Sequence, residues 1–203
     1  MIPALALALI GLWLLLAFGV RTLTQKRRTG DTGYRFGRGG RQSTAQALMT
    51  VAFVLVLAAP IAELADLPVL GAPLWEATAV RVAGLVLIAA GTAATVAAQT
   101  AMGTSWRIGV DPGERTTLVT SGPFARVRNP VFSAVGLTAL GLALAVPNAL
   151  AALMLAAYTA GVQLQVRGIE EPYLLEVHGD AYAAYTARVG RFLPGLGRSA
   201  SGA

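Results

Sequence analysis

The sequence contains no cysteine and a single histidine, His178. The absence of cysteine excludes disulfides, thiolate nucleophiles and zinc sites with cysteine ligands. One histidine excludes a multi-histidine metal centre within the chain, so we expect no metal. Charge is also scarce, because only 13% of the 203 residues are charged and 55% are hydrophobic. A soluble domain carries about 25% charged residues, and we therefore expect an integral membrane protein.

Basic residues are almost absent from the apolar stretches. Apart from Arg81, every Lys and Arg falls within 21–41, 107–128 or 167–198. The stretches between them approach the ~20 residues that cross a hydrocarbon core. The positive-inside rule places all three basic segments in the cytoplasm and the N-terminus outside. Nucleic-acid binding is disfavoured, because the basic residues flank apolar spans instead of lining a helix together with aromatics. We expect five spans, Ile2–Val20, Thr44–Ala62, Ala77–Ala98, Pro130–Val146 and Ala149–Val166.

This pattern predicts an all-α polytopic membrane helical bundle of about five transmembrane helices with a cytoplasmic helical C-terminal tail. Residues 1–99 form three N-terminal transmembrane helices with a basic cytoplasmic loop at 21–43. Residues 100–203 are expected to form the second half, with a cytoplasmic loop, a helical hairpin at 130–167 and a tail that covers the site. Within the tail, Pro172 is expected to begin a helix and Gly179 to end it. The sequence shows no glycine-rich turn of a soluble nucleotide-binding fold.

Candidate site residues lie in the basic segments after the third span. The hairpin brings Arg128-Asn129 near Glu170-Glu171, and charges facing a bundle interior at a membrane border are functional candidates. The alternative is a structural interface pair between Arg128 and Glu170. Two further pairs of residues each have two possible interpretations. Tyr182 and Tyr185 either cover a cofactor or belong to an amphipathic interfacial tail, and Trp106 and Arg107 form either an interfacial anchor or a substrate gate.

Two sequence blocks resemble a known family. Residues 118–132 read Leu-Val-Thr-Ser-Gly-Pro-Phe-Ala-Arg-Val-Arg-Asn-Pro-Val-Phe. The second block begins at Glu170-Glu171 and continues with Leu174, Gly179, Tyr182, Tyr185, Arg188 and Arg191-Phe192-Leu193-Pro194. Their order and spacing, over roughly 100–195, resemble the isoprenylcysteine carboxyl methyltransferase family and the related phospholipid N-methyltransferases. Asn129 stands where that family usually has histidine, and Phe132 where it usually has tyrosine.

The resemblance implies a membrane methyltransferase whose cofactor is S-adenosyl-L-methionine, enclosed by the last spans and the tail. Asparagine cannot titrate near neutral pH, so an acid-base role at residue 129 is lost. The catalytic candidates are Arg128, Asn129 and Glu170, and the substrate-binding candidates are Trp106, Arg107 and Phe132. The cofactor-binding candidates are Val119, Gly122, Pro123, Phe124, Arg128, Asn129, Phe132, Glu170, Glu171, Tyr182 and Tyr185.

We therefore expect methyl transfer to a lipophilic small molecule, isoprenoid-, lipid- or quinone-like, at the cytoplasmic face of the plasma membrane. The acceptor would enter sideways from the bilayer, and membrane lipid and this acceptor are the expected partners. The same helical architecture also resembles membrane sterol and fatty-chain reductases that use NADPH. A second alternative is a non-enzymatic membrane protein whose Arg and Glu residues are structural. The sequence specifies neither the acceptor nor the oligomeric state.

Overall fold

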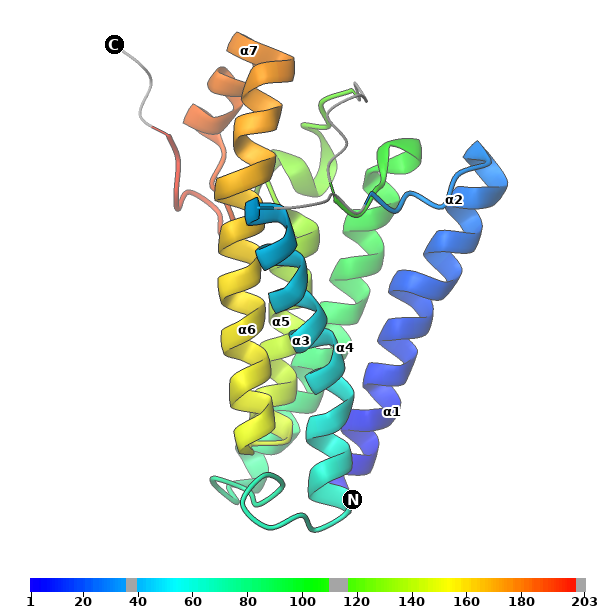
Figure 1. The fold of residues 1–203 in the computed structure, drawn as a ribbon, viewed down its shortest axis with the longest axis vertical. Helices are drawn as coiled ribbons and strands as arrows, with labels where there is room; N and C mark the ends of the chain where they lie inside the picture. The colour runs from blue at the N-terminus through cyan, green and yellow to red at the C-terminus, as the bar shows by residue number, and fades with distance from the viewer. Residues whose placement is uncertain (36–39, 110–116, 200–203) are drawn as a thin grey trace.

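The computed structural model describes residues 1–35, 40–109 and 117–199, and over these residues the regular secondary structure is helical apart from isolated bridges. The helices form an elongated bundle whose members run roughly along its long axis (Figure 1). Its long members are α1 (Ile2–Leu14), α3 (Gly40–Leu64), α4 (Thr78–Ala101), α5 (Pro130–Ala145) and α6 (Ala149–Gln165). The predicted all-α polytopic bundle is confirmed.

Four helical segments in the described residues are long and apolar enough to cross a membrane. They are Ile2–Thr29, Gln42–Leu64, Thr78–Ala101 and Ala149–Arg188. Helix α5 is apolar but has 16 residues. At 1.5 Å per residue it is about 24 Å long, short of the ~30 Å hydrocarbon core. Four of the five expected spans are thus long enough to cross, and the fourth in chain order is shorter than a full span.

The first helix continues well past the apolar stretch. A π-helical segment, η1 (Leu15–Val20), connects α1 directly to α2 (Arg21–Thr29), which ends at Gly30 with φ +76°. The prediction of a loop beginning at Arg21 is therefore wrong for its first nine residues. No Gly or Pro interrupts α2, and Arg, Lys and Gln are good helix formers, so nothing ends the helix before Gly30. Residues 36–39 of the expected loop lie outside the described residues.

The tail also departs from the prediction. Instead of breaking after α6, the chain passes through the π-helical segment η4 (Val166–Glu170) into α7 (Glu171–Arg188). Pro172 lies in the first turn of α7, where its missing N–H breaks the regular hydrogen-bond ladder. The π-helical turn before it absorbs that change of register. Gly179 interrupts α7 with φ +50° and ψ −128°, which agrees with the expected end of a helix there.

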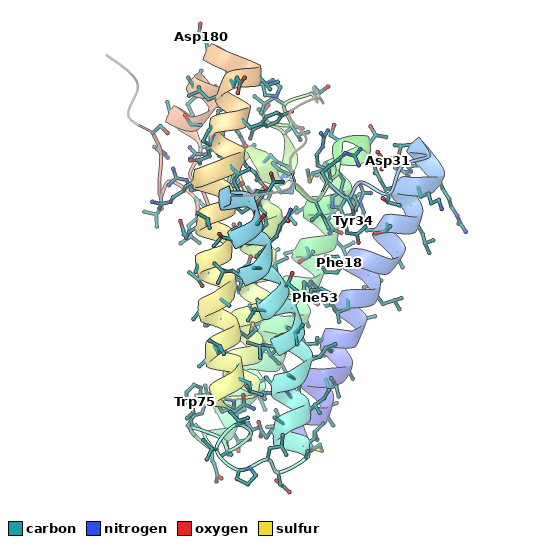
Figure 2. All side chains as sticks on the ribbon, in the orientation of Figure 1. Phe18, Asp31, Tyr34, Phe53, Trp75 and Asp180 are labelled. Atoms are coloured by element: carbon teal, nitrogen blue, oxygen red, sulfur yellow. The ribbon has the colours of Figure 1, made fainter. Side chains whose placement is uncertain are left out.

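The two ends of the bundle have different compositions. The N-terminus and residues 65–77 lie at one end, whereas α2, residues 102–109 and 117–128, and α7 lie at the other (Figure 1). Figure 2 shows Trp75 at the first end and Asp31 and Asp180 at the second. The described parts of the three basic segments therefore share one end, as predicted. We call this end the basic end.

Glycine residues allow the central helices to pack closely. Helix α4 packs along α5, and α3 packs along α6. A Cβ atom on Gly141 of α5 would lie 2.7 Å from the carbonyl oxygen of Gly84 on α4. Small residues allow this approach of backbones, which supplies packing where lipid gives no hydrophobic driving force between helices. The bundle is consequently tight along α4 and α5, and its open space lies elsewhere.

Candidate active site

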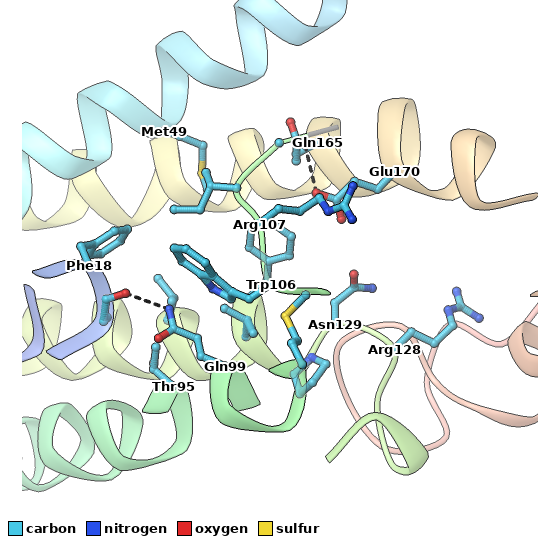
Figure 3. A pocket seen from close by; sticks show the side chains of 18 of the residues that line it. Phe18, Met49, Thr95, Gln99, Trp106, Arg107, Arg128, Asn129, Gln165 and Glu170 are labelled. Carbon is cyan, nitrogen blue, oxygen red and sulfur yellow. Dashed lines mark hydrogen bonds between the residues drawn. The ribbon is translucent and has the colours of Figure 1, made fainter. Parts of the chain in front are cut away.

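A cavity of about 660 Å³ opens at the basic end (Figure 3). Its walls come from α1, η1, α3, α4, α5 and α6, and its rim from residues 105–109, 117–119 and α7. On α5 the lining runs from Pro130 to Ala139, and on α6 from Gln165 down to Met154. At 1.5 Å per residue these stretches are about 14 to 17 Å long, roughly half of a ~30 Å hydrocarbon core. The cavity thus joins a polar rim to a deep apolar end.

Arg128 lies just before α5 and is 5% exposed. Its Nη1 donates to the carbonyl oxygens of Thr186 (3.0 Å) and Val189 (3.1 Å). Its Nη2 donates to Glu171 Oε1 (2.8 Å) and to the Gly197 carbonyl oxygen (3.1 Å). The guanidinium group therefore fastens the end of α7 and the following residues to the start of α5. Both terminal nitrogens are used by the chain itself.

The segment Gly190–Gly197, which we call the tail strap, is held at several points. The Arg191 side chain binds Glu171 through both carboxylate oxygens, at 2.7 and 2.9 Å. This ion pair raises the pKa of the Arg191 guanidinium above its usual value. Asn129 donates its backbone N–H and its side-chain amide to the Arg191 carbonyl oxygen, each at 3.1 Å. Ser133 Oγ donates to the Phe192 carbonyl oxygen at 2.7 Å. The strap is thus tied both to the start of α5 and to Glu171 of α7.

The neighbouring carboxylates Glu170 and Glu171 have different surroundings and different partners. Glu171 is shared between Arg128 and Arg191 and is not part of the cavity lining. Glu170 lines the cavity and accepts a hydrogen bond from Gln165 Nε2 at 3.0 Å. Consecutive helical residues point about 100° apart, which is why two adjacent glutamates face different surroundings. Arg128 therefore pairs with Glu171 and not with Glu170, contrary to the structural alternative raised from the sequence.

Aromatic side chains form the rest of the rim. Tyr182 and Tyr185 line the cavity, and both are buried. Their ring centroids lie 6.2 Å apart, and the Tyr185 hydroxyl donates to the Phe124 carbonyl oxygen at 2.6 Å. Burial on the cavity side does not fit an amphipathic tail whose tyrosines face the membrane interface. The contact with Phe124 fixes the ring of Tyr185 against residues 122–125.

Trp106 is 2% exposed and lines the cavity, so it is not an interfacial anchor on the surface. The Arg21 guanidinium lies 5.1 Å from its ring centroid and also donates to the Gly103 carbonyl oxygen. Tyr34 contacts the same indole edge to face. Arg107 lines the cavity beside it. Part of the basic segment after the first span is therefore built into the wall of the cavity, beyond its expected role in topology.

Most predicted site residues meet at this cavity. The lining includes Trp106, Arg107, Val119, Phe124, Arg128, Asn129, Phe132, Glu170, Tyr182 and Tyr185. Gly122, Pro123 and Glu171 are not part of the lining. Gly122, with φ +59°, begins a 3₁₀ turn over Gly122–Ala125, and this turn places Phe124 at the cavity. Gly122 and Pro123 thus act on the rim through Phe124.

Sequence reasoning missed the contribution of the first two spans. Trp13, Phe18 and Phe53 line the cavity from α1, η1 and α3. Aromatic residues within an apolar span look the same in sequence whether they face lipid or a cavity. A stronger signal was present in the glutamines, since Gln99 and Gln165 are polar residues within apolar helices, and such residues face a bundle interior. Both are buried and both line the cavity.

A family model described as phospholipid methyltransferase matches residues 79–181. The match runs from α4 through α5 and α6 into α7, and it contains Arg128, Asn129, Glu170 and Glu171. It leaves out η1 and α3, which carry Phe18 and Phe53. A comparison with curated proteins gives no match. The apolar helices and the matched half of the chain together show that this integral membrane protein belongs to the phospholipid methyltransferase family, a family of membrane methyltransferases.

Proposed function

We propose that this protein transfers a methyl group from S-adenosyl-L-methionine to a lipophilic small molecule at the cytoplasmic face of the plasma membrane. The observation that carries the proposal is a single cavity with a polar rim from the family-matched half and an apolar end at half the depth of a bilayer. Its volume lies within the ~300–1,000 Å³ of typical small-molecule sites. The clustering of basic residues at the cavity end supports a cytoplasmic location for that end.

The rim residues suit the groups that this cofactor carries. Glu170 offers a carboxylate at the cavity and is oriented by Gln165, which fits an ammonium group or ribose hydroxyls. Tyr182, Tyr185 and Phe124 offer aromatic surface for a nucleoside base. When bound, the cofactor supplies a methyl group on a sulfonium that is already activated for displacement. Arg128 keeps the rim in shape by holding the tail strap, because its terminal donors are used within the chain.

The protein contributes to methyl transfer mainly by positioning the two reactants and excluding water. Trp106, buried beside Arg107, covers the cavity from the side of α2, and Tyr182 and Tyr185 cover it from the side of α7. Asn129 donates its amide to the Arg191 carbonyl oxygen and cannot accept a proton at neutral pH. An acceptor carboxylate needs no base, whereas a hydroxyl acceptor would have to lose its proton to another group.

Calorimetry on detergent-purified protein tests the proposal. We expect saturable binding of S-adenosyl-L-methionine with a stoichiometry of about one, which the variant Glu170→Gln weakens. Thermal-shift measurements with S-adenosyl-L-methionine and with NADPH provide the matched comparison. Stabilisation by NADPH alone would instead support a reductase. Absence of binding by either compound to well-folded protein would support a non-enzymatic role and contradict the proposal.

A further inference from the structure

The seam between the first helix and α3 differs from the other helix seams around the cavity. Where α3 meets α6, a Cβ on Gly161 would lie 3.1 Å from Met49 Cγ, and α4 and α5 are at least as close. At cavity level, η1 and α3 instead meet through two rings, Phe18 and Phe53. Their centroids lie 5.4 Å apart in an edge-to-face arrangement, and Figure 2 shows them side by side. Two side chains can separate by changing rotamer, whereas packed backbones cannot.

Phe53 borders both the cavity and the outer surface of the bundle. It lines the cavity and is 44% exposed. Thr50, one turn away on α3, also lines the cavity and is exposed, and Gln46 continues the same edge of the helix. This edge lies within the candidate span Gln42–Leu64, so its outer side faces acyl chains when the helix crosses a bilayer. The two rings therefore separate the cavity from lipid.

The other ring lies at an irregular point of the first helix. Phe18 belongs to the π-helical segment η1, and Gly19 follows it. Below it, Ala6 and Ile10 are fully buried in the core and fix α1. Above it, Arg21 fixes the helix to Gly103 and Trp106. A π-helical turn interrupts the regular hydrogen-bond ladder and is frequent at functional sites. Phe18 thus sits in the irregular turn of the helix, next to Ala17, whose carbonyl oxygen accepts a hydrogen bond from Gln99.

We propose that the Phe18–Phe53 contact is the passage through which the apolar chain of the acceptor enters the cavity from the bilayer. The two rings then select acceptors by the width of the chain that passes between them. The inference rests on the proposed function in treating the cavity as the site of methyl transfer. Both residues lie outside the family match at 79–181, so the N-terminal helices of this chain carry the selection.

The absence of cysteine allows this passage to be closed by a crosslink without background. The variant Phe18→Cys/Phe53→Cys would be treated with dibromobimane, a short thiol-reactive crosslinker, in a Trp75→Phe background. The remaining tryptophans, Trp13 and Trp106, both line the cavity and are 4% and 2% exposed, so a quencher must enter the cavity to reach them. The probe is dodecanoic acid brominated on its terminal carbon, added to protein in lipid nanodiscs, with tryptophan emission followed over time.

We expect the probe to quench emission in the untreated double variant and in each single-cysteine variant treated with the same reagent. Crosslinking should slow quenching at least tenfold. A second variant, Phe53→Ala, widens the passage without any crosslink and should speed quenching at least threefold. An unchanged rate in both the crosslinked protein and Phe53→Ala overturns the proposal, and so does the absence of quenching in the uncrosslinked protein.

Binding of S-adenosyl-L-methionine to the same crosslinked sample separates this inference from the proposed function. The proposed cofactor contacts Glu170, Tyr182 and Tyr185 belong to η4 and α7, which do not form the seam, so cofactor affinity should stay within about twofold of the untreated protein. If crosslinking slows entry of the probe but the protein binds no cofactor, the passage is supported and the proposed function is contradicted. If the protein binds the cofactor but admits the probe at the same rate after crosslinking, the proposed function is supported and the passage is contradicted.

Discussion

The two ends of the bundle use arginine with a largely buried side chain in the same way, but among the described residues only the basic end has a cavity lined by the predicted site residues. At the end with the N-terminus, Arg81 pairs with Glu63 and donates Nε to the Ala145 carbonyl oxygen at 2.9 Å. At the basic end, Arg128 pairs with Glu171 and donates to backbone carbonyl oxygens. Each arginine ties helices together, so an arginine–carboxylate pair does not identify a site. The distinguishing group is Glu170, which lines the cavity and has no arginine partner among the described residues.

The largest effect on stability should come from Arg81→Ala. This variant leaves the largely buried Glu63 unpaired, and breaking a buried ion pair in this way costs about 3–5 kcal/mol of unfolding free energy. Cofactor affinity should not change, because the pair lies at the far end from the cavity. Thermal unfolding in detergent and calorimetry below the transition measure the two quantities. The double variant Glu63→Ala/Arg81→Ala should recover part of the lost unfolding free energy. A weaker cofactor affinity in folded Arg81→Ala would contradict the contrast drawn between the two ends.

Arg128→Ala should affect both quantities. Its cost in unfolding free energy should be about 3 kcal/mol, at the lower end for a buried pair, since Arg191 still neutralises Glu171. Cofactor affinity should also fall at least tenfold, because the tail strap loses its bonds to Arg128. Faster tryptic cleavage after Arg191 would report release of the strap. Arg128→Lys keeps the charge without the forked donors and should lie between the two proteins. Unchanged cleavage in Arg128→Ala would show that the strap is held by other contacts.

Glu170→Gln should change binding with little change in stability. Glutamine can still accept the hydrogen bond from Gln165, but it removes the charge that faces the cavity. A hydrogen bond to a charged group contributes about 1.5–3 kcal/mol, so affinity for S-adenosyl-L-methionine should fall by roughly 10- to 100-fold. Glu176→Gln, on the exposed surface of α7, is the matched control and should bind as the original chain does. Equal affinity in both variants would remove Glu170 from the site.

The smallest effect should come from Asn129→His, which restores the residue usual in the resembling family. An imidazole titrates near pH 6.5, so the variant gains a positive charge as the pH falls below that value. This charge lies beside a cavity proposed to hold a sulfonium, so affinity should fall by about threefold between pH 8 and pH 5.5. Calorimetry across this range should show a larger fall in affinity for the variant than for the original chain. An identical pH profile in the two proteins would place residue 129 away from the cofactor.

The helical fold could be predicted because apolar length and the distribution of basic residues determine spans and topology. The errors fall where helices end. Residues Arg21–Thr29 are charged and polar enough to suggest a loop, yet their helix propensity lets α2 continue to Gly30. Pro172 suggests a break, yet the π-helical segment η4 accommodates it within one continuous run. Both errors treat a change in polarity or a single proline as the end of a helix.

The site could be predicted only in part. The hairpin places Arg128 near the two glutamates, and motif spacing found most of the rim. Which glutamate faces the cavity depends on the rotation of the helix about its axis after a π-helical turn, and sequence does not give that rotation. The contributions of Phe18 and Phe53 were missed because both lie in apolar spans where nearly every residue is large and hydrophobic. Their role depends on which helices are neighbours.

The tail strap also has a consequence for biogenesis. Residues Gly190–Gly197 are translated after every helix that they fasten, so the rim is complete only when the membrane helices are already made. A chain truncated near residue 185 would keep Arg128 and Glu171 but would lack the Val189 and Gly197 carbonyl oxygens that Arg128 binds. Reporter fusions intended to preserve the site should accordingly be joined beyond Arg198 through a flexible linker. A bulky domain placed earlier would prevent the strap from binding to the start of α5.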